Sequence, residues 1–225
     1  MTAMLASVSN LDEALQVLAV NVGIIDLKQP SQGALGALSL DTVSTIVTAI
    51  NGQCPLSATI GDLPMHPEVV ASAVKRMAAT GVDYIKIGFF PGDDWPGTLE
   101  VLAEPAASGL ALIAVLFADC QPDFTVLGTL KQAGFKGVMI DTQDKQKGAL
   151  TQILPQADIK AFVEKAARYQ LLCGLAGSLR LEDIAQLISL QPDYLGFRGA
   201  LCRQHDRTAQ LDEHALRAVK ARMMQ

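Results

Sequence analysis

A basic excess, long apolar runs and closely spaced metal ligands are what this sequence has little of. Its 225 residues carry 18 basic and 23 acidic side chains, for a formal net charge of −5. A nucleic-acid binder needs clustered Lys and Arg to neutralise phosphates, so we expect no nucleic acid partner. The longest apolar stretch covers only residues 109–118, whereas a helix that spans a bilayer needs roughly 20 apolar residues. We therefore expect no membrane segment.

Cysteine and histidine are few and dispersed. No C-x-x-C pair and no H-E-x-x-H motif occurs, so the sequence predicts no metal site. It also lacks a P-loop and a complete dinucleotide-binding glycine fingerprint, and we expect no cofactor. The amino terminus has no basic segment followed by a long apolar one, so no signal peptide is expected. A cytoplasmic location with reduced cysteines follows, and these cysteines are Cys54, Cys120, Cys173 and Cys202.

Eight short apolar runs rich in β-forming residues are what the sequence does contain. Each is followed by a helix-like segment, and their starts lie about 20 to 35 residues apart, the length of one βα unit. Most are continuously apolar, as expected for parallel strands covered on both faces. Eight such units predict a TIM (β/α)₈ barrel as a single domain over residues 1–225, with a doubly wound open sheet as the structural alternative. The predicted strands are Met4–Val8, Val22–Lys28, Leu56–Ile60, Asp83–Gly88, Ala111–Phe117, Gly137–Asp141, Leu171–Leu175 and Tyr194–Arg198.

Lys86 is the most informative polar residue in these runs. It lies in an otherwise apolar strand, and the period of two places it on the face opposite Ile85 and Ile87. Active sites of TIM barrels lie at the carboxyl ends of the strands, and buried lysines are rare unless paired. We expect Lys86 to point into the barrel, either as a catalytic amine or as a lysine salt-bridged across it.

Asp26 and Lys28 share one face at the end of the second predicted strand. They form either a structural ion pair or part of a catalytic site. Loss of water and repulsion from Lys86 lower the pKa of an amine, and a neutral amine can form a Schiff base, but Asp26 raises that pKa. Asp141 and Lys145, four residues apart, face the same side if a helical turn begins there. Lys145 as a solvated loop charge fits the sequence equally well.

The loops after strands seven and eight often bind phosphate in TIM barrels. Here they contain Gly177 and Ser178, then Arg198 and Gly199. The glycines let backbone N–H groups approach an anion, while Ser178 adds a hydroxyl and Arg198 a charged fork. Three more residues near strand ends are expected to contact the substrate, namely Ser7, Thr59 and Asp62.

Six segments, most of which overlap the predicted strand ends, carry a further signal: Ile25–Gly36, Ser57–Pro64, Asp83–Gly88, Met139–Thr142, Leu175–Ser178 and Gly196–Cys202. In this order they resemble the motifs of the (5-formylfuran-3-yl)methyl phosphate synthase family, also called 4-(hydroxymethyl)-2-furancarboxaldehyde phosphate synthase. The resemblance spans nearly the whole chain. It departs from the family at residues 203–207, where Arg-Gln-His-Asp-Arg stands in place of a glycine pair before Asp-Arg.

The resemblance implies a TIM-barrel lyase that needs no cofactor. Such an enzyme joins two molecules of glyceraldehyde 3-phosphate, with loss of phosphate and water, into the furan precursor of methanofuran-type one-carbon coenzymes. By the same resemblance Lys28 forms the Schiff base and Lys86 transfers protons. Asp26, Asp141 and Lys145 match further active-site positions, Lys145 through a loop that differs from the family pattern.

Two other functions remain open from the residues themselves. The first is another phosphate-binding barrel enzyme, such as a class I aldolase or a sugar-phosphate isomerase. The second is a non-catalytic barrel that binds a phosphorylated ligand. In each case the expected partner is a small phosphorylated molecule, a triose phosphate if the resemblance holds. The apolar composition, 50% hydrophobic, favours a homo-oligomer.

Overall fold

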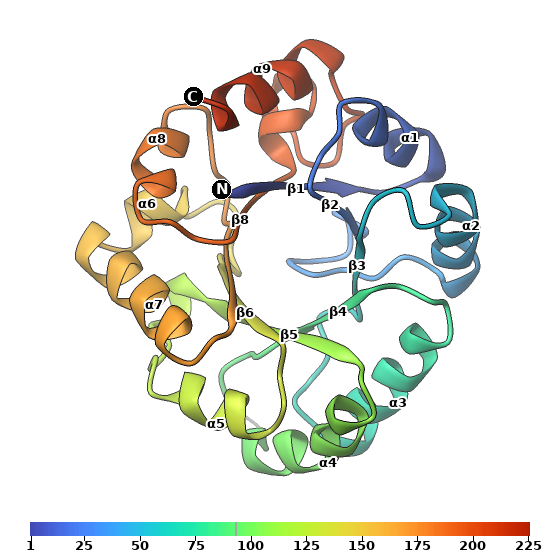
Figure 1. Ribbon diagram of the computed structural model, residues 1–225, viewed down its shortest axis with the longest axis vertical. Coiled ribbons are helices and arrows are strands. Elements are labelled where there is room, and N and C mark those ends of the chain that lie inside the picture. The colour runs from blue at the N-terminus through green and yellow to red at the C-terminus, as the bar shows by residue number, and fades with distance from the viewer. Residues whose placement is uncertain (93) are drawn as a thin grey trace.

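Eight parallel strands close into one barrel in the computed structural model, which describes residues 1–92 and 94–225. The strands follow one another round the barrel in chain order, and β1 pairs with β8 to complete it (Figure 1). This confirms the TIM barrel and excludes the doubly wound sheet, in which the strand order reverses. The strands are β1 (Ala3–Val8), β2 (Ile24–Leu27), β3 (Leu56–Thr59), β4 (Tyr84–Gly88), β5 (Ala111–Phe117), β6 (Gly137–Asp141), β7 (Leu172–Leu175) and β8 (Tyr194–Phe197).

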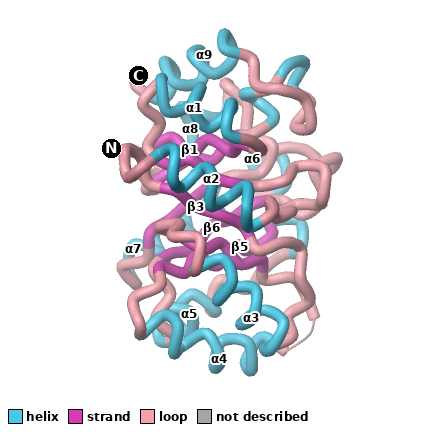
Figure 2. The backbone as a smooth tube through the Cα atoms, turned by 90° about the vertical axis from the view of Figure 1, so that its right-hand side faces the viewer, coloured by secondary structure: helices cyan, strands magenta, loops and turns pink. Residues whose placement is uncertain are grey.

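Helices form a ring round the strands in Figure 1, and the side view in Figure 2 shows the strands at the centre with helices above and below them. Helical starts follow the expected chemistry: the Asn10 side chain accepts a hydrogen bond from the Glu13 backbone N–H, and Pro67 begins its helix. No helix of the described residues is long and apolar enough to cross a membrane. The α-helices are α1 (Leu11–Ala19), α2 (Leu40–Ile50), α3 (Pro67–Ala78), α4 (Trp95–Ala107), α5 (Val126–Gln132), α6 (Leu150–Ile153), α7 (Gln156–Arg168), α8 (Asp183–Ile188) and α9 (Glu213–Met223), and the 3₁₀ turns are η1 (Ala118–Cys120), η2 (Gly199–Leu201) and η3 (Arg203–His205).

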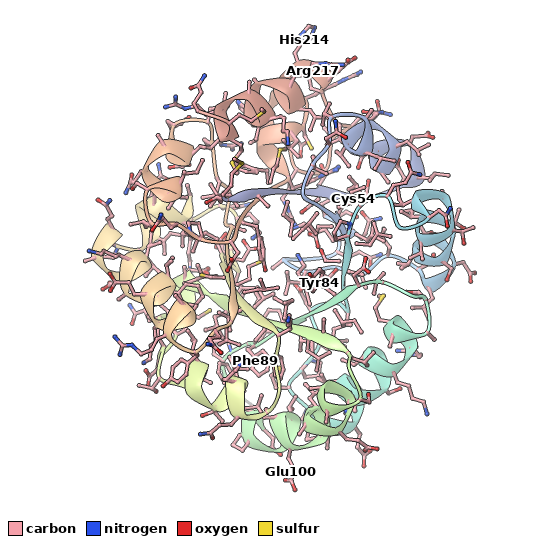
Figure 3. All side chains as sticks on the ribbon, viewed as in Figure 1. Cys54, Tyr84, Phe89, Glu100, His214 and Arg217 are labelled. Carbon is pink, nitrogen blue, oxygen red and sulfur yellow. The ribbon has the colours of Figure 1, made fainter. Side chains whose placement is uncertain are left out.

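Alternation along each strand divides the buried residues into two layers. Ile85 and Ile87 of β4 pack in the large core between strands and helices, whereas Tyr84 packs with the smaller cluster inside the barrel. Figure 3 shows Tyr84 within the ring of strands, while Glu100 and Arg217 lie on the outer circumference. Lys86 shares the inward face with Tyr84, as the period of two predicts.

Candidate active site

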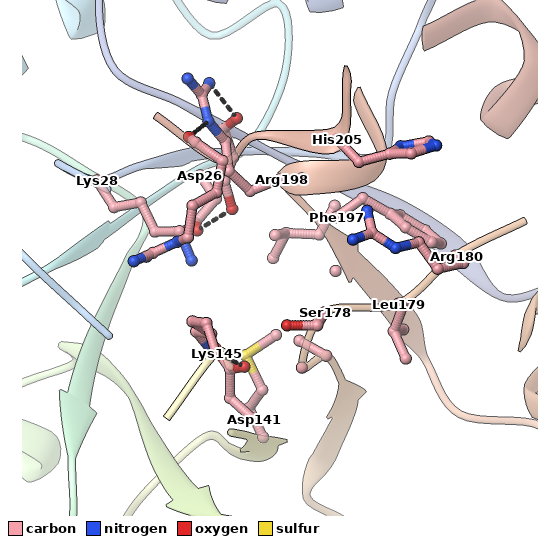
Figure 4. Close-up of a pocket in the computed structure, with 18 of the residues that line it drawn as sticks. Asp26, Lys28, Asp141, Lys145, Ser178, Leu179, Arg180, Phe197, Arg198 and His205 are labelled. Atoms are coloured by element: carbon pink, nitrogen blue, oxygen red, sulfur yellow. Dashed lines mark hydrogen bonds and ion pairs between the residues drawn. The ribbon is translucent and has the colours of Figure 1, made fainter. Parts of the chain in front are cut away.

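A polar cavity of about 240 Å³ opens at the carboxyl ends of the strands. This is slightly smaller than the roughly 300–1,000 Å³ of ordinary ligand pockets, so it suits a molecule of a few carbon atoms. All but two of the predicted site residues line it (Figure 4), and they are Ser7, Asp26, Lys28, Lys86, Asp141, Lys145, Gly177, Ser178, Arg198 and Gly199. The two lysines predicted to converge, Lys28 and Lys86, therefore share one cavity with the glycine loops of β7 and β8.

Asp26 of β2 forms its ion pair with Lys86 of β4, not with its strand neighbour Lys28. The Lys86 Nζ lies 2.7 Å from Asp26 Oδ1, and the two side chains are 2% and 0% exposed. The hydroxyls of Ser7 and Ser57 donate to the two carboxylate oxygens at 2.8 and 2.7 Å. Burial raises the pKa of Asp26, but the charges of Lys86 and Lys28 outweigh it and hold the pKa below its usual value. This carboxylate is thus ionised, and each of its two oxygens has at least one polar partner.

Asp141, the last residue of β6, forms a second ion pair with Lys145. The Lys145 Nζ lies 2.6 Å from Asp141 Oδ1 and also donates to the backbone carbonyl and hydroxyl of Thr142. Burial raises the pKa of Asp141, but Lys145 and Lys28 bring it down to about 2. Lys145 is therefore folded back onto the strand end, and the alternative of a solvated loop charge is wrong.

Lys28 differs from both of these lysines. It is 6% exposed, and within residues 1–92 and 94–225 no ion pair or hydrogen bond reaches its Nζ. The pKa of Lys28 is lowered to about 7, chiefly by burial; Asp141 and Asp26 oppose this shift, while Lys145 and Lys86 add to it. A large share of this amine is thus neutral near pH 7, as a nucleophile requires.

The loops after β7 and β8 lie across the cavity from Lys28 and present backbone N–H groups that have no acceptor among the described residues. In the described part of the chain no acceptor takes the N–H groups of Ser178, Leu179 and Gly199, all of which line the cavity. Gly177 has φ +108°, and a Cβ there would lie 2.8 Å from a Thr142 methyl carbon, so only glycine fits. Free N–H groups in such a loop are suited to bind an anion.

Arg198 takes a different role from the one its position predicts. Its Nε donates to the Arg207 carbonyl, Nη1 to Glu13 and the Ser7 carbonyl, and Nη2 to Glu13 and the Ala209 carbonyl. The shortest of these contacts is 2.6 Å, to Glu13. A guanidinium has five N–H donors, and all five are occupied. Arg198 therefore ties β8 to β1 and α1 and has no donor left for a phosphate.

Thr59 and Asp62 do not line the cavity. The Thr59 hydroxyl donates to the backbone carbonyl of Gly36, and the Asp62 carboxylate accepts from the N–H groups of Ala34 and Leu35, both at 2.7 Å. Both residues thus fix the loop after β2, which reaches over the mouth of the barrel (Figure 1). They support the site from outside it in place of the substrate contact predicted.

Asp119, in the turn η1 that follows β5, is a supporting residue that was not among the predicted site residues. Its two carboxylate oxygens accept from the backbone N–H groups of Gln143 and Asp144 at 2.7 and 2.9 Å, and Lys147 lies 3.7 Å away. These bonds hold the loop that carries Lys145. A polar residue at a strand end was the available signal, but its partners are backbone groups, which no side-chain pattern reveals.

Two more arginines line the cavity beyond the one predicted, Arg180 after β7 and Arg207 after β8. Neither lies at a strand end, so the strand-end rule does not select them. Among the described residues, no group of three or more His, Cys, Asp or Glu side chains comes together in a way that could hold a metal ion.

The barrel and its cavity define a class: TIM-barrel proteins with buried lysines beside glycine-containing loops at the carboxyl ends of their strands. Solved structures agree on the fold. Phosphoribosyl anthranilate isomerase of Thermotoga maritima matches with a TM-score of 0.73 at 11% identity, covering 100% of this chain and 99% of that one. KGPDC of Streptococcus mutans matches with a TM-score of 0.69 at 14% identity over 99% of this chain and 97% of its own.

Sequence comparison narrows the class to one family. The family model for 4-HFC-P synthase matches residues 4–220. A relative from Methylorubrum extorquens is 44% identical over 210 residues, 93% of this chain and 86% of its own. The (5-formylfuran-3-yl)methyl phosphate synthases of Methanopyrus kandleri and Methanosarcina mazei are 33% and 30% identical, over 91% and 88% of this chain and 91% and 90% of their own. The chain belongs to the 4-HFC-P synthase family. Membership of this family supports the conclusion that the protein is an enzyme.

Proposed function

We propose that this chain is a lyase that condenses two molecules of glyceraldehyde 3-phosphate into (5-formylfuran-3-yl)methyl phosphate through a Schiff base on Lys28. One observation carries the proposal: Lys28 is the cavity lysine with no ion pair in the described residues, and burial brings its pKa down to about 7. The names of the relatives supply the product.

The choice of Lys28 over its neighbours rests on their partners. Lys86 and Lys145 each lie within 2.7 Å of a buried carboxylate, and such a partner favours the charged ammonium. Only a neutral amine attacks a carbonyl carbon. Lys28 condenses with the carbonyl of one triose phosphate, isomerised to the ketone within the site or before binding, and water leaves as the imine forms.

The two ion pairs are suited to move protons round this imine. Once protonated, the imine draws electrons and makes the neighbouring carbon acidic. Lys86 with Asp26, or Asp141 with Lys145, takes and returns the protons of the enamine and hydroxyl groups. Lys86 and Lys145 each lie against a carboxylate and Lys28 does not, so the three amines differ in role although they share one cavity.

The carbon framework is completed by the second substrate. The enamine attacks the carbonyl of another triose phosphate, and elimination of phosphate, ring closure and loss of water follow. Two molecules of C₃H₇O₆P give C₆H₇O₆P, one H₃PO₄ and two H₂O, so no oxidant or reductant is needed. The product serves as the furan precursor of a methanofuran-type coenzyme in this proposal.

Incubation with glyceraldehyde 3-phosphate tests the proposal directly. We expect near-ultraviolet absorbance from the furan and release of one phosphate per two substrates. Borohydride added during turnover should reduce the imine and leave a triose phosphate adduct on the peptide that contains Lys28. Lys28→Met should abolish both signals, and Lys160→Met, on the outer face of α7, should preserve both.

Three results would count against the proposal. Isomerised triose phosphate as the main product, with no furan, would point to a sugar-phosphate isomerase. An adduct only on Lys86 would exchange the roles of the two lysines. Steady furan formation with no trapped adduct would remove the imine from the mechanism.

A further inference from the structure

We infer that Arg180, and not Arg198, supplies the positive charge that binds the phosphate group of the substrate. The inference rests on the proposed function for the identity of the phosphorylated ligand. It rests on the structure for the comparison of these two arginines, which line the same cavity but differ in what their guanidinium groups contact.

Arg198 is neutralised and saturated. Its guanidinium pairs with Glu13, and backbone carbonyls occupy the donors that remain. An incoming phosphate would have to displace a buried carboxylate partner at 2.6 Å. Breaking a buried ion pair leaves an uncompensated charge and is strongly unfavourable. Arg198 therefore stays with Glu13 when a ligand binds.

Arg180 has the opposite properties. Its Nη1 is buried, yet no hydrogen-bond partner reaches it within residues 1–92 and 94–225. The nearby carboxylate of Asp183 is already used, because it accepts from the Arg180 backbone N–H and from the Thr151 hydroxyl. A buried donor without an acceptor is costly, so each such group needs an explanation. A bound anion supplies the missing acceptor.

The surroundings of Arg180 select a phosphate rather than a neutral group. Its Nη1 lies 3.4 Å from the position a Cβ would take on Gly199, so it adjoins the loop whose N–H groups are free. Arg207 adds a second cation to the same side of the cavity; one of its nitrogens donates to the Gly33 carbonyl. The two guanidinium groups balance the two negative charges of a phosphate dianion, and the N–H donors can bond to its terminal oxygens.

Among the described residues, no acidic side chain forms an ion pair with Arg180. Asp206 also lines the cavity, and its carboxylate accepts from the backbone and hydroxyl of Thr208. His205 lies beside Arg180 at the rim (Figure 4). Lys28 and Asp26 occupy the opposite side of the cavity in the same view. A triose phosphate held by Arg180 would thus extend its carbonyl end toward Lys28.

Binding of inorganic phosphate, measured by isothermal titration calorimetry on the full chain, separates the two arginines. We expect Arg180→Gln to weaken phosphate binding about 10- to 100-fold, the loss of one or two charge-assisted hydrogen bonds. Arg180→Lys should recover part of the affinity, because it keeps the charge but not the fork. Arg203→Gln, an exposed arginine on the same loop as His205, is the matched control and should bind like the wild type.

Reductive trapping on Lys28 provides the second readout. Arg180→Gln should reduce adduct formation from glyceraldehyde 3-phosphate but leave adduct formation from unphosphorylated glyceraldehyde unchanged. Wild-type phosphate affinity in Arg180→Gln, equal loss with both aldehydes, or no phosphate binding by the wild type would overturn the inference. A wild type that binds phosphate through Arg180 yet makes no furan would leave the inference intact and refute the proposed function instead.

Discussion

The two ends of the barrel interior are built from contrasting residues. The amino-terminal end is a tightly filled floor of Leu5, Ile24, Tyr84, Ile113, Leu172 and Tyr194, with a residual void of about 10 Å³. The carboxyl-terminal end is a cavity of about 240 Å³ lined by acids and amines. Lys86 touches both, because its stem lies over the floor and its Nζ reaches Asp26. One end is built for packing and the other for chemistry.

The contrast shows how an apolar floor controls the chemistry above it. Burial disfavours the charged form of an amine unless a carboxylate lies beside it. Lys86 and Lys145 have such a partner, and Lys28 has none among the described residues. Burial lowers the pKa of Lys28 to about 7, so a large share of this one amine is neutral near pH 7. Changes at either end should separate stability from activity.

The largest effect is expected from Lys86→Met. Loss of this amine leaves the fully buried Asp26 carboxylate without its counter-ion, and breaking a buried pair costs about 3–5 kcal/mol of unfolding free energy. Lys28→Met removes the proposed Schiff-base amine and should abolish activity. Because that amine is costly to bury, its removal should cause no loss of stability. Urea unfolding of both variants measures the difference. The double variant Asp26→Asn, Lys86→Met should regain stability but not activity; equal stability of the two single variants would contradict this account.

Ile113→Ala in the floor should have the reverse effect of Lys28→Met: it should lower stability and preserve activity. The buried side chain is 3% exposed, and truncation of a buried Ile costs about 2–4 kcal/mol through lost burial and a new cavity. The mouth is untouched, so kcat at a temperature where the variant is folded should change less than about threefold. Thermal unfolding and the furan assay together measure this. A large loss of kcat at full folding would show that the two ends are coupled.

The pH dependence of stability provides a further test. A difference of one bound proton between the folded and unfolded chains changes the free energy of unfolding by about 1.4 kcal/mol per pH unit. The pKa of Lys28 is about 7 in the folded chain and about 10.4 when unfolded. Between these values the unfolded chain holds a proton that the folded chain lacks. The destabilising contribution of Lys28 is thus complete below pH 7 and fades as the pH rises. The stability of the wild type minus that of Lys28→Met should increase over this window.

This difference isolates Lys28 from groups that act in the other direction. Burial raises the pKa values of Tyr194 and Cys202, so their contributions to stability are lost at high pH in both proteins. Activity should rise with pH through about 7 and then level off. A pH-independent difference between the two proteins, or an activity that keeps rising to pH 10, would show that Lys28 has an ordinary pKa.

The smallest effect is expected from Asp119→Asn at the rim of the mouth. The buried carboxylate holds two backbone N–H groups of the loop that bears Lys145. An amide accepts with one oxygen only, so kcat should fall about tenfold, or about 1.4 kcal/mol. In a Lys145→Met background the same substitution should have little further effect. Asp123→Asn, an exposed aspartate that accepts from Thr125, is the matched control.

Much of this organisation follows from the sequence alone. Continuous apolar runs at regular spacing predict the closed barrel, and the period of two places Lys86 and Asp26 inside it. The pairing of Asp26 could not be predicted, because Lys28 is its neighbour along β2 but Lys86 faces it from β4. Residues within one strand face are evident from sequence; partners across the barrel depend on register and stagger.

The arginines show the limit more clearly. Arg198 follows β8 and has the position of a phosphate ligand, but Glu13, nearly two hundred residues earlier, occupies its guanidinium. Arg180 lies five residues beyond the end of β7 and gains its significance from the absence of any such partner in the described residues. Chemistry at one position depends on contacts that only the closed barrel creates.

The seam between β1 and β8 has a consequence for how the chain is made. Arg198 bonds to Glu13 and to the Ser7 carbonyl, and β1 finds its second neighbour only in β8. While the ribosome is still adding the final unit, the first strand keeps one edge unpaired and Glu13 lacks its counter-ion. Nascent chains that stop before residue 194 should therefore remain open to proteases and chaperones, and closure should coincide with release of the last βα segment.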